Sequence, residues 1–524
     1  MAPRMFISGL LATAGLVLPA VAQLSGTVGP TTSTAAKQHK ICNIMDYGGK
    51  ADAKADNGPA IAAAWKDCAK GGEVLIPEGD YGMATWVKLV GGKGTSINLE
   101  GTIYRTGRDE GNMFMIEHST DFEFYSATSK GAIQGYGYEF HKEGKLGARL
   151  LRLWDVQDFS VHDVILVDAP QFHLSIDTCS NGEVYNMIIH GGYQGGLDGI
   201  DVWGSNIWIH DIEVSNKDEC VTVKDPSDHL LIEQVHCNWS GGCAMGSLAT
   251  DINIHDIEYN HIYTHHSNQM YMIKSNGGTG TVSNLAFNNF TGHSNAYTLD
   301  FDTAWGSMKK VAGDGISYSN ISFSGWRGTC ADGTQRGPIK MNCPAAVPCT
   351  GITVDDFSVW TEKGKQVLHG CQNAYGEGAC LKPGGGATPA YTSTRTVTAS
   401  GDAAYETMAN ELAAGWDAKS PIPIPTMPAS FYPGRQPISA ILGGGGGGGG
   451  GSRAGSKGKA AVPAKVPAPL PTGGAGAGGD GSGVPSATGF VTRKSSAAAP
   501  QPTDGGRGEQ GQGRGSHGGG CHKA

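Results

Sequence analysis

The sequence predicts an all-β protein whose main body is a right-handed parallel β-helix. A segment of alternating apolar and polar residues recurs, at first every 22–25 residues and later at 33. Each copy turns at an Asn or Asp and continues as a second short strand, and the Leu-x-x-Leu-x-Leu pattern of the main alternative, a leucine-rich repeat, is missing. One such unit cannot bury its apolar face alone, so successive units must stack, each adding about 4.8 Å. The copies begin at Asp158, Glu183, Asn206, His229, Asp251, Asn284 and Ser317.

Residues 1–22 have the composition of a secretory signal peptide. Arg4 precedes an apolar run from Phe6 to Leu18, and Ala20-Val21-Ala22 forms a small-residue cleavage site. This run is too short to cross a bilayer, and no later segment reaches the roughly 20 apolar residues that a span requires. We therefore expect a secreted, extracellular protein that has no membrane partner.

The rest of the chain divides into one long domain and a tail. Residues 23–441 have a continuous apolar pattern without an internal linker, which predicts a single β-helix domain with a C-terminal cap. Residues 442–524 are rich in Gly, Pro and Ser, and we expect disorder because they cannot offset the entropy of ordering. This tail carries nine Lys or Arg against three Asp or Glu, which leaves about −15 on the remaining chain. Such an acidic body argues against a nucleic-acid partner.

The two ends of the domain depart from the repeat. Residues 23–41 are predicted to be a flexible leader. The Ala-rich stretch Asn57–Ala69 predicts a short amphipathic helix that covers the first coil, with Asn57 as its cap. Near the other end, Ala403–Trp416 is predicted to be helical and Pro421–Pro428 extended, and together they would form the cap.

Twelve cysteines in an exported chain predict a framework of disulfides. Local spacing pairs Cys42 with Cys68, Cys220 with Cys237, Cys343 with Cys349, and Cys371 with Cys380, and leaves over Cys179, Cys243, Cys330 and Cys521. Three Asn-x-Ser/Thr sequons predict glycosylation at Asn238, Asn289 and Asn320. The histidines are scattered and no Cys-x-x-Cys pair occurs, so no metal site is predicted.

Two acidic stretches lie about one repeat apart, each directly before a short strand. Asp198 lies in the first, and Asp218 and Glu219 lie in the second. Residues one period apart on a β-helix face the same way, so the three carboxylates should converge on one groove. Their expected separation suits an acid and base acting on a glycosidic bond, and clustering raises the pKa of at least one of them. The alternative is that these acids are solvated turn residues.

The repeat and these acids resemble the pectin-degrading glycoside hydrolases of family 28, which have a pectin-lyase-like β-helix. Polygalacturonases of that family carry, in order, N-T-D, D-D, G-H-G and R-I-K. The corresponding residues of this chain are Gly196-Leu197-Asp198, Asp218-Glu219, Gly241-Gly242-Cys243 and Met272-Ile273-Lys274. The match covers most of residues 42–360, and the Asp-Glu form of the pair resembles the fungal rhamnogalacturonan hydrolase branch.

The resemblance implies a role for each acid. Asp218 would be the general acid, and Asp198 and Glu219 would position and deprotonate the attacking water. Lys274 would hold a galacturonate carboxylate as a point charge. The family inverts the anomeric carbon in one displacement and requires no cofactor or metal. Met272 replaces an Arg that is understood to bind a galacturonate carboxylate, which predicts a rhamnose at that position.

These departures point to the galacturonic acid–α-1,2-rhamnose linkage of the rhamnogalacturonan I backbone, cut internally by a monomeric enzyme. Two alternatives within the family are a polygalacturonase and a xylogalacturonan hydrolase. A β-helix lyase would need a calcium site and an Arg or Lys base, yet the groove segments contain no Arg. A non-catalytic carbohydrate-binding β-helix also stays open.

The histidine of the family motif has no direct counterpart. Cys243 occupies its position and is expected to be a core residue. His293 also precedes a strand, but about three coils from Asp218, which is about 14 Å at the spacing of strands. It is a candidate for a supporting role in the active site or for a remote contact with sugar. Four aromatic residues are candidates to stack on sugar rings: Trp203, Tyr271, Trp305 and Trp326.

Overall fold

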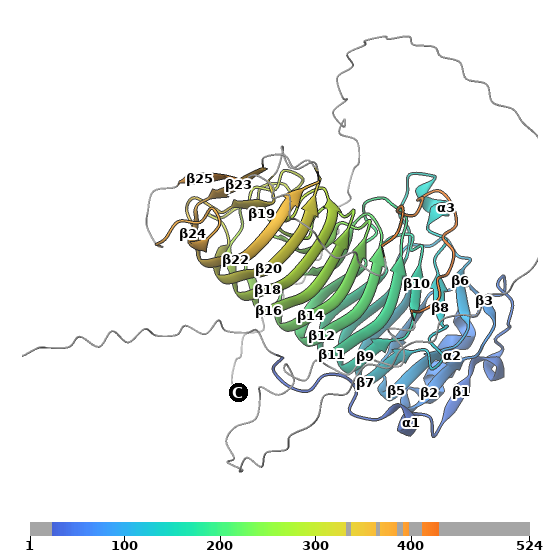
Figure 1. Cartoon of the computed structure of the whole chain (residues 1–524). Coiled ribbons are helices and arrows are strands. Elements are labelled where there is room, and N and C mark those ends of the chain that lie inside the picture. Colours follow the sequence, from blue (N-terminus) through green and yellow to red (C-terminus); the bar gives the residue numbers. More distant parts are fainter. Residues whose placement is uncertain (1–23, 332–336, 363–366, 385–390, 398–410, 429–524) are drawn as a thin grey trace, which may run out of the picture. The chain divides into compact units, whose positions relative to one another are not determined.

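Coils of short strands, paired in parallel from one coil to the next, form the body of the protein, as the repeat predicted (Figure 1). The computed structural model describes residues 24–331, 337–362, 367–384, 391–397 and 411–428. The predicted signal peptide, residues 1–22, and the predicted tail, residues 442–524, lie outside the described residues. No helix in the described part of the chain is long and apolar enough to cross a membrane.

The coils contain long strands of 12–17 residues and short strands of 3–7 residues. The long strands are β7 (Asn112–Tyr125), β9 (Arg149–His162), β11 (Leu174–His190), β12 (Ile200–Ser215), β14 (Ser227–Asn238), β16 (Ile252–His265), β18 (Gly280–Asn295), β20 (Ser317–Cys330) and β22 (Cys349–Thr361). The short strands are β8 (Ala132–Gln134), β10 (Ile165–Val167), β13 (Glu219–Val223), β15 (Gly242–Leu248), β17 (Tyr271–Ser275), β19 (Leu299–Asp302), β21 (Ile339–Asn342), β23 (Val367–Gln372) and β24 (Ala374–Gly378). Each pairs with its equivalent one coil away, so that β14 lies between β12 and β16.

Smaller elements form the two ends. The first coils contain β1 (Ile41–Asn43), β2 (Lys70–Ile76), β3 (Asp80–Met83), β4 (Val87–Val90), β5 (Lys93–Leu99) and β6 (Thr102–Arg105). The helices are α1 (Thr34–Lys37), the 3-10 turn η1 (Ile44–Tyr47), α2 (Gly58–Cys68) and α3 (Tyr138–His141). At the other end β25 (Thr392–Val397) pairs antiparallel with β23.

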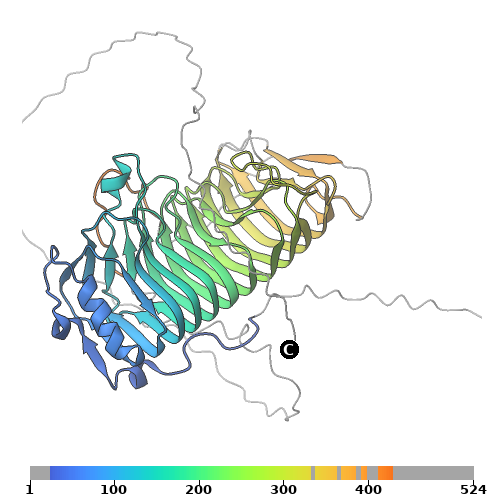
Figure 2. The same cartoon turned by 180° about the vertical axis from the view of Figure 1, so that it is seen from behind.

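Helix α2 confirms the predicted helix and covers the first coil, as Figure 2 shows from behind. Ile61 and Trp65 are buried on its inner face. Pro59 stands in the first turn, where its missing N–H costs nothing. Asn57 does not cap the helix as predicted, because its side chain instead bonds to the backbone of Lys50.

The core is a continuous column of apolar side chains enclosed by the coils. Equivalent residues of successive coils stack inside it, as Phe290 and Trp326 do with ring centroids 4.2 Å apart. Trp326 and Tyr271 are both fully buried. The prediction that they stack on sugars is therefore wrong, because their ring faces are covered by neighbouring coils.

Residues at equivalent bends of successive coils form a column along the axis, and we call this set the corner column. Its members have φ between 52° and 58°, a left-handed conformation that Asn and Asp tolerate better than most residues. They are Asp121, Asp158, Asn181, Asn206, His229, Asp256, Asn284 and Asn320. Asparagines on neighbouring coils are hydrogen-bonded to each other: Asn206 Nδ2 donates to Asn181 Oδ1 at 2.9 Å in this column, and elsewhere Asn289 Nδ2 donates to Asn260 Oδ1 at 2.9 Å.

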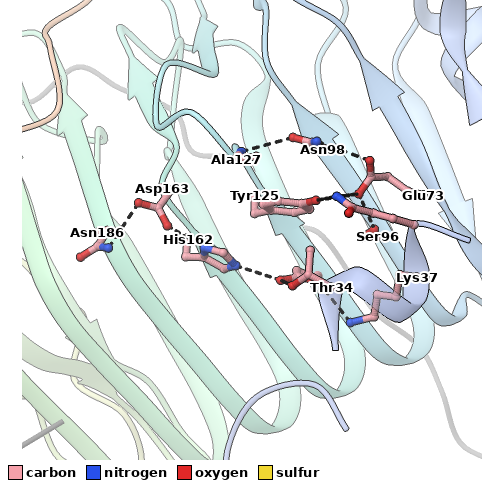
Figure 3. Close-up of polar contacts among 12 residues, drawn as sticks. Thr34, Lys37, Glu73, Ser96, Asn98, Tyr125, Ala127, His162, Asp163 and Asn186 are labelled. Atoms are coloured by element: carbon pink, nitrogen blue, oxygen red, sulfur yellow. Dashed lines mark hydrogen bonds and ion pairs between the residues drawn. The ribbon is translucent and has the colours of Figure 1, made fainter. Parts of the chain in front are cut away.

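Residues 24–40 form an ordered N-terminal arm, so the prediction of a flexible leader is wrong for them. Thr34 Oγ1 donates to Glu123 Oε1 at 2.7 Å, and Lys37 Nζ lies 3.4 Å from Glu123 Oε2. Lys37 is 1% exposed. The arm is held because it supplies partners to carboxylates on the outer face of the coils, and Figure 3 shows Thr34 and Lys37 turned toward this face.

His162 lies between two carboxylates beneath the arm (Figure 3). Its Nδ1 is 2.8 Å from Asp163 Oδ2 and its Nε2 is 3.1 Å from Glu123 Oε1. Burial alone would lower the pKa of His162, but the two carboxylates outweigh burial and raise it. Burial would likewise raise the pKa of Glu123, yet His162 and Lys37 hold it below its usual value. The charged pair therefore stabilises the fold between two limits of pH.

We expect the free energy of unfolding to fall on both sides of this window. The raised pKa of His162 gives a contribution that is full below the ordinary value of 6.5 and is lost as pH rises through the folded pKa. The lowered pKa of Glu123 gives a contribution present above 4.5 and lost as pH falls through its folded pKa. Near pH 5.5, His162→Gln should lower the free energy of unfolding by about 1.5–3 kcal/mol, the value of hydrogen bonds to charged groups.

Urea unfolding at several pH values measures this effect. The control is His118→Gln, which removes a histidine 2.7 Å from Asp155 in an exposed pair. Parallel pH profiles for the wild type and His162→Gln would contradict the prediction.

The four predicted disulfides are present: Cys42–Cys68, Cys220–Cys237, Cys343–Cys349 and Cys371–Cys380. Cys179, Cys243 and Cys330 are unpaired and buried, and Cys521 lies outside the described residues. Among the sequons, Asn289 and Asn320 are exposed. Asn238 is 1% exposed, so the folded protein has no room for a glycan there, and that prediction is wrong.

Residues 411–428, which we call the C-terminal strap, run across the coils (orange in Figure 1). Trp239 Nε1 donates to Leu412 O at 2.9 Å, and Gln134 Nε2 donates to Ile422 O at 2.8 Å. Residues 411–416 are not helical, because their backbone bonds to the coils rather than to itself. The rest of that predicted helix, residues 403–410, lies outside the described residues, and residues 421–428 have no helix or strand.

Candidate active site

Asp198, Asp218 and Glu219 lie at the entry of two neighbouring strands and converge, as predicted. Asp198 comes just before β12, and Asp218 and Glu219 stand at the start of β13. The two strands pair in parallel, with Ile200 opposite Val221. One oxygen from each of the three carboxylates lies within 4.8 Å of the others. The three carboxylates therefore meet because the strands of adjacent coils pair in this register.

Local hydrogen bonds hold the Asp218 carboxylate in place. Its Oδ2 accepts from the backbone N–H of Gly196, and its Oδ1 accepts from the N–H of Glu219 at 3.0 Å. Gly196 has φ of +82°, where a side chain would be strained. Buried Asn216 donates to the carbonyls of Leu197 and Glu219, and so joins the two acidic stretches. This agrees with a structural role for Asn216.

Asp201 is a fourth buried carboxylate, which the sequence analysis did not single out. Lys224 Nζ lies 3.1 Å from Asp201 Oδ1 and 3.8 Å from Asp198 Oδ2. A signal for Asp201 existed in the alternation of β12, since Ile200 and Val202 point into the core and the residue between them must point outward. Its partner Lys224 follows the next strand and could be paired with it only through the fold.

The acids shift one another's pKa values. Burial, reinforced by the nearby charges of Asp201 and Asp218, raises the pKa of Asp198 well above its usual range and outweighs Lys224. Burial also raises the pKa of Asp201 against the attraction of Lys224. Asp198 therefore retains its proton well above the pH at which an ordinary Asp ionises.

Lys274 is the second cation of the site. Its Nζ forms an ion pair with Glu219 Oε1, and both side chains are at least 90% buried. The ammonium also lies 5.0 Å from the ring centroid of Trp305. Burial lowers the pKa of Lys274, although Asp218, Asp198 and Asp201 favour its charged form. In this arrangement Lys274 serves Glu219, in addition to any contact with a substrate carboxylate.

Met272 lies on the same strand as Lys274 and is 6% exposed. Its neighbours Tyr271 and Ile273 point into the core, so Met272 points outward. It stands in register with Ala244 on one side and Asp300 on the other. This position presents an apolar surface beside the acids.

The structure does not bring His293 together with the three acids. His293 on β18 lies opposite His265 on β16, and His265 lies opposite Asn238 on β14. One coil further back, Asn238 follows Cys237, which lies opposite Val214 on β12, the strand that precedes Asp218. His293 thus lies three coils from the coil of Asp218, about 14 Å along the axis. Its Nδ1 contacts Glu411 of the C-terminal strap.

Cys243 is a core residue, as expected. It is fully buried, burial raises the pKa of its thiol to about 12, and its Sγ lies 3.9 Å from Cys237 Sγ. Among the aromatic candidates, Trp203 and Trp305 are partly exposed, and Trp305 lies beside Lys274. Trp154 was not among the predicted aromatic residues. It is 37% exposed and lies two coils from Trp203, with Asp177 between them in the same outward-facing column.

Comparisons with known proteins agree with this geometry. The family profile described as Glycosyl hydrolases family 28 matches residues 71–380. Rhamnogalacturonase A of Emericella nidulans is 59% identical over 442 residues, which cover 84% of this chain and 87% of that protein. Rhamnogalacturonase A of Aspergillus aculeatus is 57% identical over 437 residues, which cover 83% of this chain and 99% of that protein.

Two solved structures share the fold. The endo-xylogalacturonan hydrolase from Aspergillus tubingensis aligns with a TM-score of 0.56 at 22% identity, over 65% of this chain and 96% of that one. The polygalacturonase from Erwinia carotovora ssp. carotovora aligns with a TM-score of 0.51 at 16% identity, over 64% of this chain and 96% of that one. At these identities the likeness is one of fold.

Proposed function

Since the chain belongs to glycosyl hydrolases family 28 and is a glycoside hydrolase, we propose that it cleaves the galacturonic acid–α-1,2-rhamnose linkage inside the rhamnogalacturonan backbone. The observation that carries this proposal is the convergence of Asp198, Asp218 and Glu219 at the entry of two adjacent strands. The names of the relatives supply the polysaccharide. The outward-facing Met272 supports a neutral deoxy sugar on one side of the cleaved bond, because it offers an apolar contact.

The reaction assigns one task to each acid. Asp218 gives its proton to the glycosidic oxygen as the bond from that oxygen to the anomeric carbon breaks. A water molecule attacks the anomeric carbon from the opposite face and loses a proton to Glu219, which is the ion-pair partner of Lys274. Asp198 retains its proton and orients the water by hydrogen bonding.

Two stereochemical outcomes compete. We propose inversion, because the resemblance to family 28 implies it and because two carboxylates, Asp198 and Glu219, share the task of holding one water. One oxygen from each carboxylate lies within 4.8 Å of the others, and this close approach favours the other outcome, since inverting glycosidases usually separate their carboxyl groups by about 6.5–9.5 Å. In that retaining route a carboxylate would attack the anomeric carbon directly.

Product analysis by NMR on de-esterified rhamnogalacturonan tests substrate and mechanism together. We expect galacturonic acid to appear first as the β-anomer, on fragments of intermediate length. A first product in the α form would establish retention, and an unsaturated product absorbing in the ultraviolet would establish a lyase. Faster cleavage of polygalacturonate than of rhamnogalacturonan would overturn the proposed substrate.

We also propose that the enzyme is secreted and acts outside the cell as a monomer, with glycans at Asn289 and Asn320. The apolar segment and small-residue site within residues 1–22 support export. The exposed positions of both asparagines support glycosylation. His293 is proposed as a positioning residue that fixes the C-terminal strap through Glu411 rather than as an acid or base.

A further inference from the structure

Two histidines and two aspartates meet at the corner column. They lie past the C-terminal end of β13, whereas Glu219 stands at its N-terminal end. His229 and Asp256 are neighbours in this column, on consecutive coils. Asp228 and His255 precede them and face each other in the same register. One donor atom each of His229, His255 and Asp256 lies within 4.8 Å of the others. All three side chains are 28–33% exposed, so solvent reaches the cluster.

Hydrogen bonds fix the direction in which His229 points. Asp228 Oδ1 accepts from Ser205 Oγ at 2.7 Å and lies 2.6 Å from His229 Nδ1. The proton of the imidazole is therefore held on Nδ1, and the lone pair of Nε2 is directed toward Asp256. A carboxylate that orients a histidine in this way is the usual support of a metal ligand.

Asp256 is fixed in the same manner. Its Oδ1 accepts from Asn284 Nδ2 at 3.1 Å, which leaves Oδ2 facing the two histidines. Oδ2 lies 2.9 Å from His255 Nδ1 and 3.8 Å from His229 Nε2. Donor atoms bound at 2.0–2.1 Å to a tetrahedral zinc ion stand about 3.3 Å apart. The hydrogen bond between His255 and Asp256 therefore has to lengthen and give up its proton when the ion binds, and the separation of Asp256 from His229 has to shorten. At 3.8 Å this separation is too wide for a hydrogen bond.

We propose that His229, His255 and Asp256 form a binding site for a divalent transition-metal ion of the zinc type. Two imidazoles and one carboxylate are ligands suited to zinc rather than to calcium, which prefers oxygen alone. The open side of the cluster leaves the fourth position to water. The ion joins the coil of β14 to the coil of β16 at their corner, and it takes no part in the hydrolytic reaction.

Isothermal titration with zinc chloride tests the site, using the full chain freed of metal by a chelator. In His229→Asn we expect the loss of one equivalent of bound zinc, or binding at least about 100-fold weaker. Asn fits this position because Asn181, Asn206, Asn284 and Asn320 occupy it on other coils. The fold and the cleavage of rhamnogalacturonan should therefore stay unchanged, which makes failure of this inference separable from failure of the proposed function.

Two further variants sharpen the test. His118→Asn is a matched control, because His118 also has a left-handed backbone and lies 2.7 Å from an aspartate but belongs to no such cluster among the described residues. It should bind zinc as the wild type does. Asp228→Asn keeps the ligands but loses their support, and should weaken binding about 10–100-fold.

Zinc bound elsewhere, including at Cys521 and His522, is common to all variants and cancels in the comparison. Zinc should also raise the melting temperature of the wild type more than that of His229→Asn. Equal stoichiometry and affinity in the wild type and His229→Asn would overturn the inference, as would a wild type that binds no zinc.

Discussion

Replacing Asp218 by Asn is expected to lower kcat on rhamnogalacturonan by about 10²–10⁴-fold, because the leaving oxygen no longer receives a proton. The amide has the shape of the carboxyl group, so substrate binding should change less than kcat. Asn can accept only one of the two backbone hydrogen bonds that Asp218 receives from Gly196 and Glu219, and the melting temperature should be measured beside the rate.

An activated substrate separates lost chemistry from lost structure. A rhamnogalacturonan oligosaccharide that ends in a nitrophenyl leaving group needs no proton donor. If the variant lacks only the proton donor, Asp218→Asn should cleave this substrate at most of the wild-type rate. If the substitution has damaged the site, cleavage of this substrate should also be slow. Asp158→Asn is the control, since Asp158 lies in the corner column and only accepts from Asn181 at 2.9 Å. Loss of activity in this control, or full activity of Asp218→Asn on the polysaccharide, would contradict the assignment.

Replacing Lys274 by Met is the second large expected effect. Lys274 is the cationic partner of buried Glu219, and three further carboxylates surround the pair. Without the ammonium, Glu219 loses the positive charge that favours its ionised form, so a smaller fraction of it can act as the base at acidic pH. We expect kcat/KM to fall by about 10²–10⁴-fold, as for loss of a general base, and stability to fall by about 3–5 kcal/mol.

The pH profile distinguishes this explanation from a packing defect. The acidic limb of kcat/KM should move to higher pH in Lys274→Met, because the missing positive charge no longer favours ionised Glu219. Lys340→Met offers a control. Lys340 lies two coils beyond Lys274, and its Nζ is 2.5 Å from Asp302 Oδ2. Its loss should leave the acidic limb of kcat/KM unchanged. An acidic limb unchanged in Lys274→Met would show that Lys274 does not act through Glu219.

The parts of the molecule that could be predicted are those that depend on period. A repeat of 22–25 residues determines the coil, and the coil in turn determines that Asp198 and Asp218 face one groove, because register carries over from strand to strand. The disulfides were predictable because their partners lie 6–26 residues apart in sequence. These features need only local spacing and the rule that coils stack.

The parts that could not be predicted depend on contacts between distant segments. The N-terminal arm looked unstructured because Lys37 finds Glu123 only after the coils have formed. Residues 411–416 favour a helix locally, but the coils supply their backbone with other partners, such as Trp239. Lys274 was expected to face substrate, and its ion pair with Glu219 arises from two strands that are not adjacent in sequence.

The C-terminal strap can bind only after the coils have folded, which fixes the order of these two folding steps. Each coil pairs with the preceding coil, and the paired residues are only a few tens of residues apart in sequence. Coils can therefore pack one after another during synthesis. The strap instead joins Ile422 to Gln134, 288 residues earlier. It can dock only after nearly all the coils have been synthesised, and it crosses them back toward the first ones. The contacts of the strap therefore form after those of the coils, and a chain that ended before residue 411 would have its coils but not these contacts.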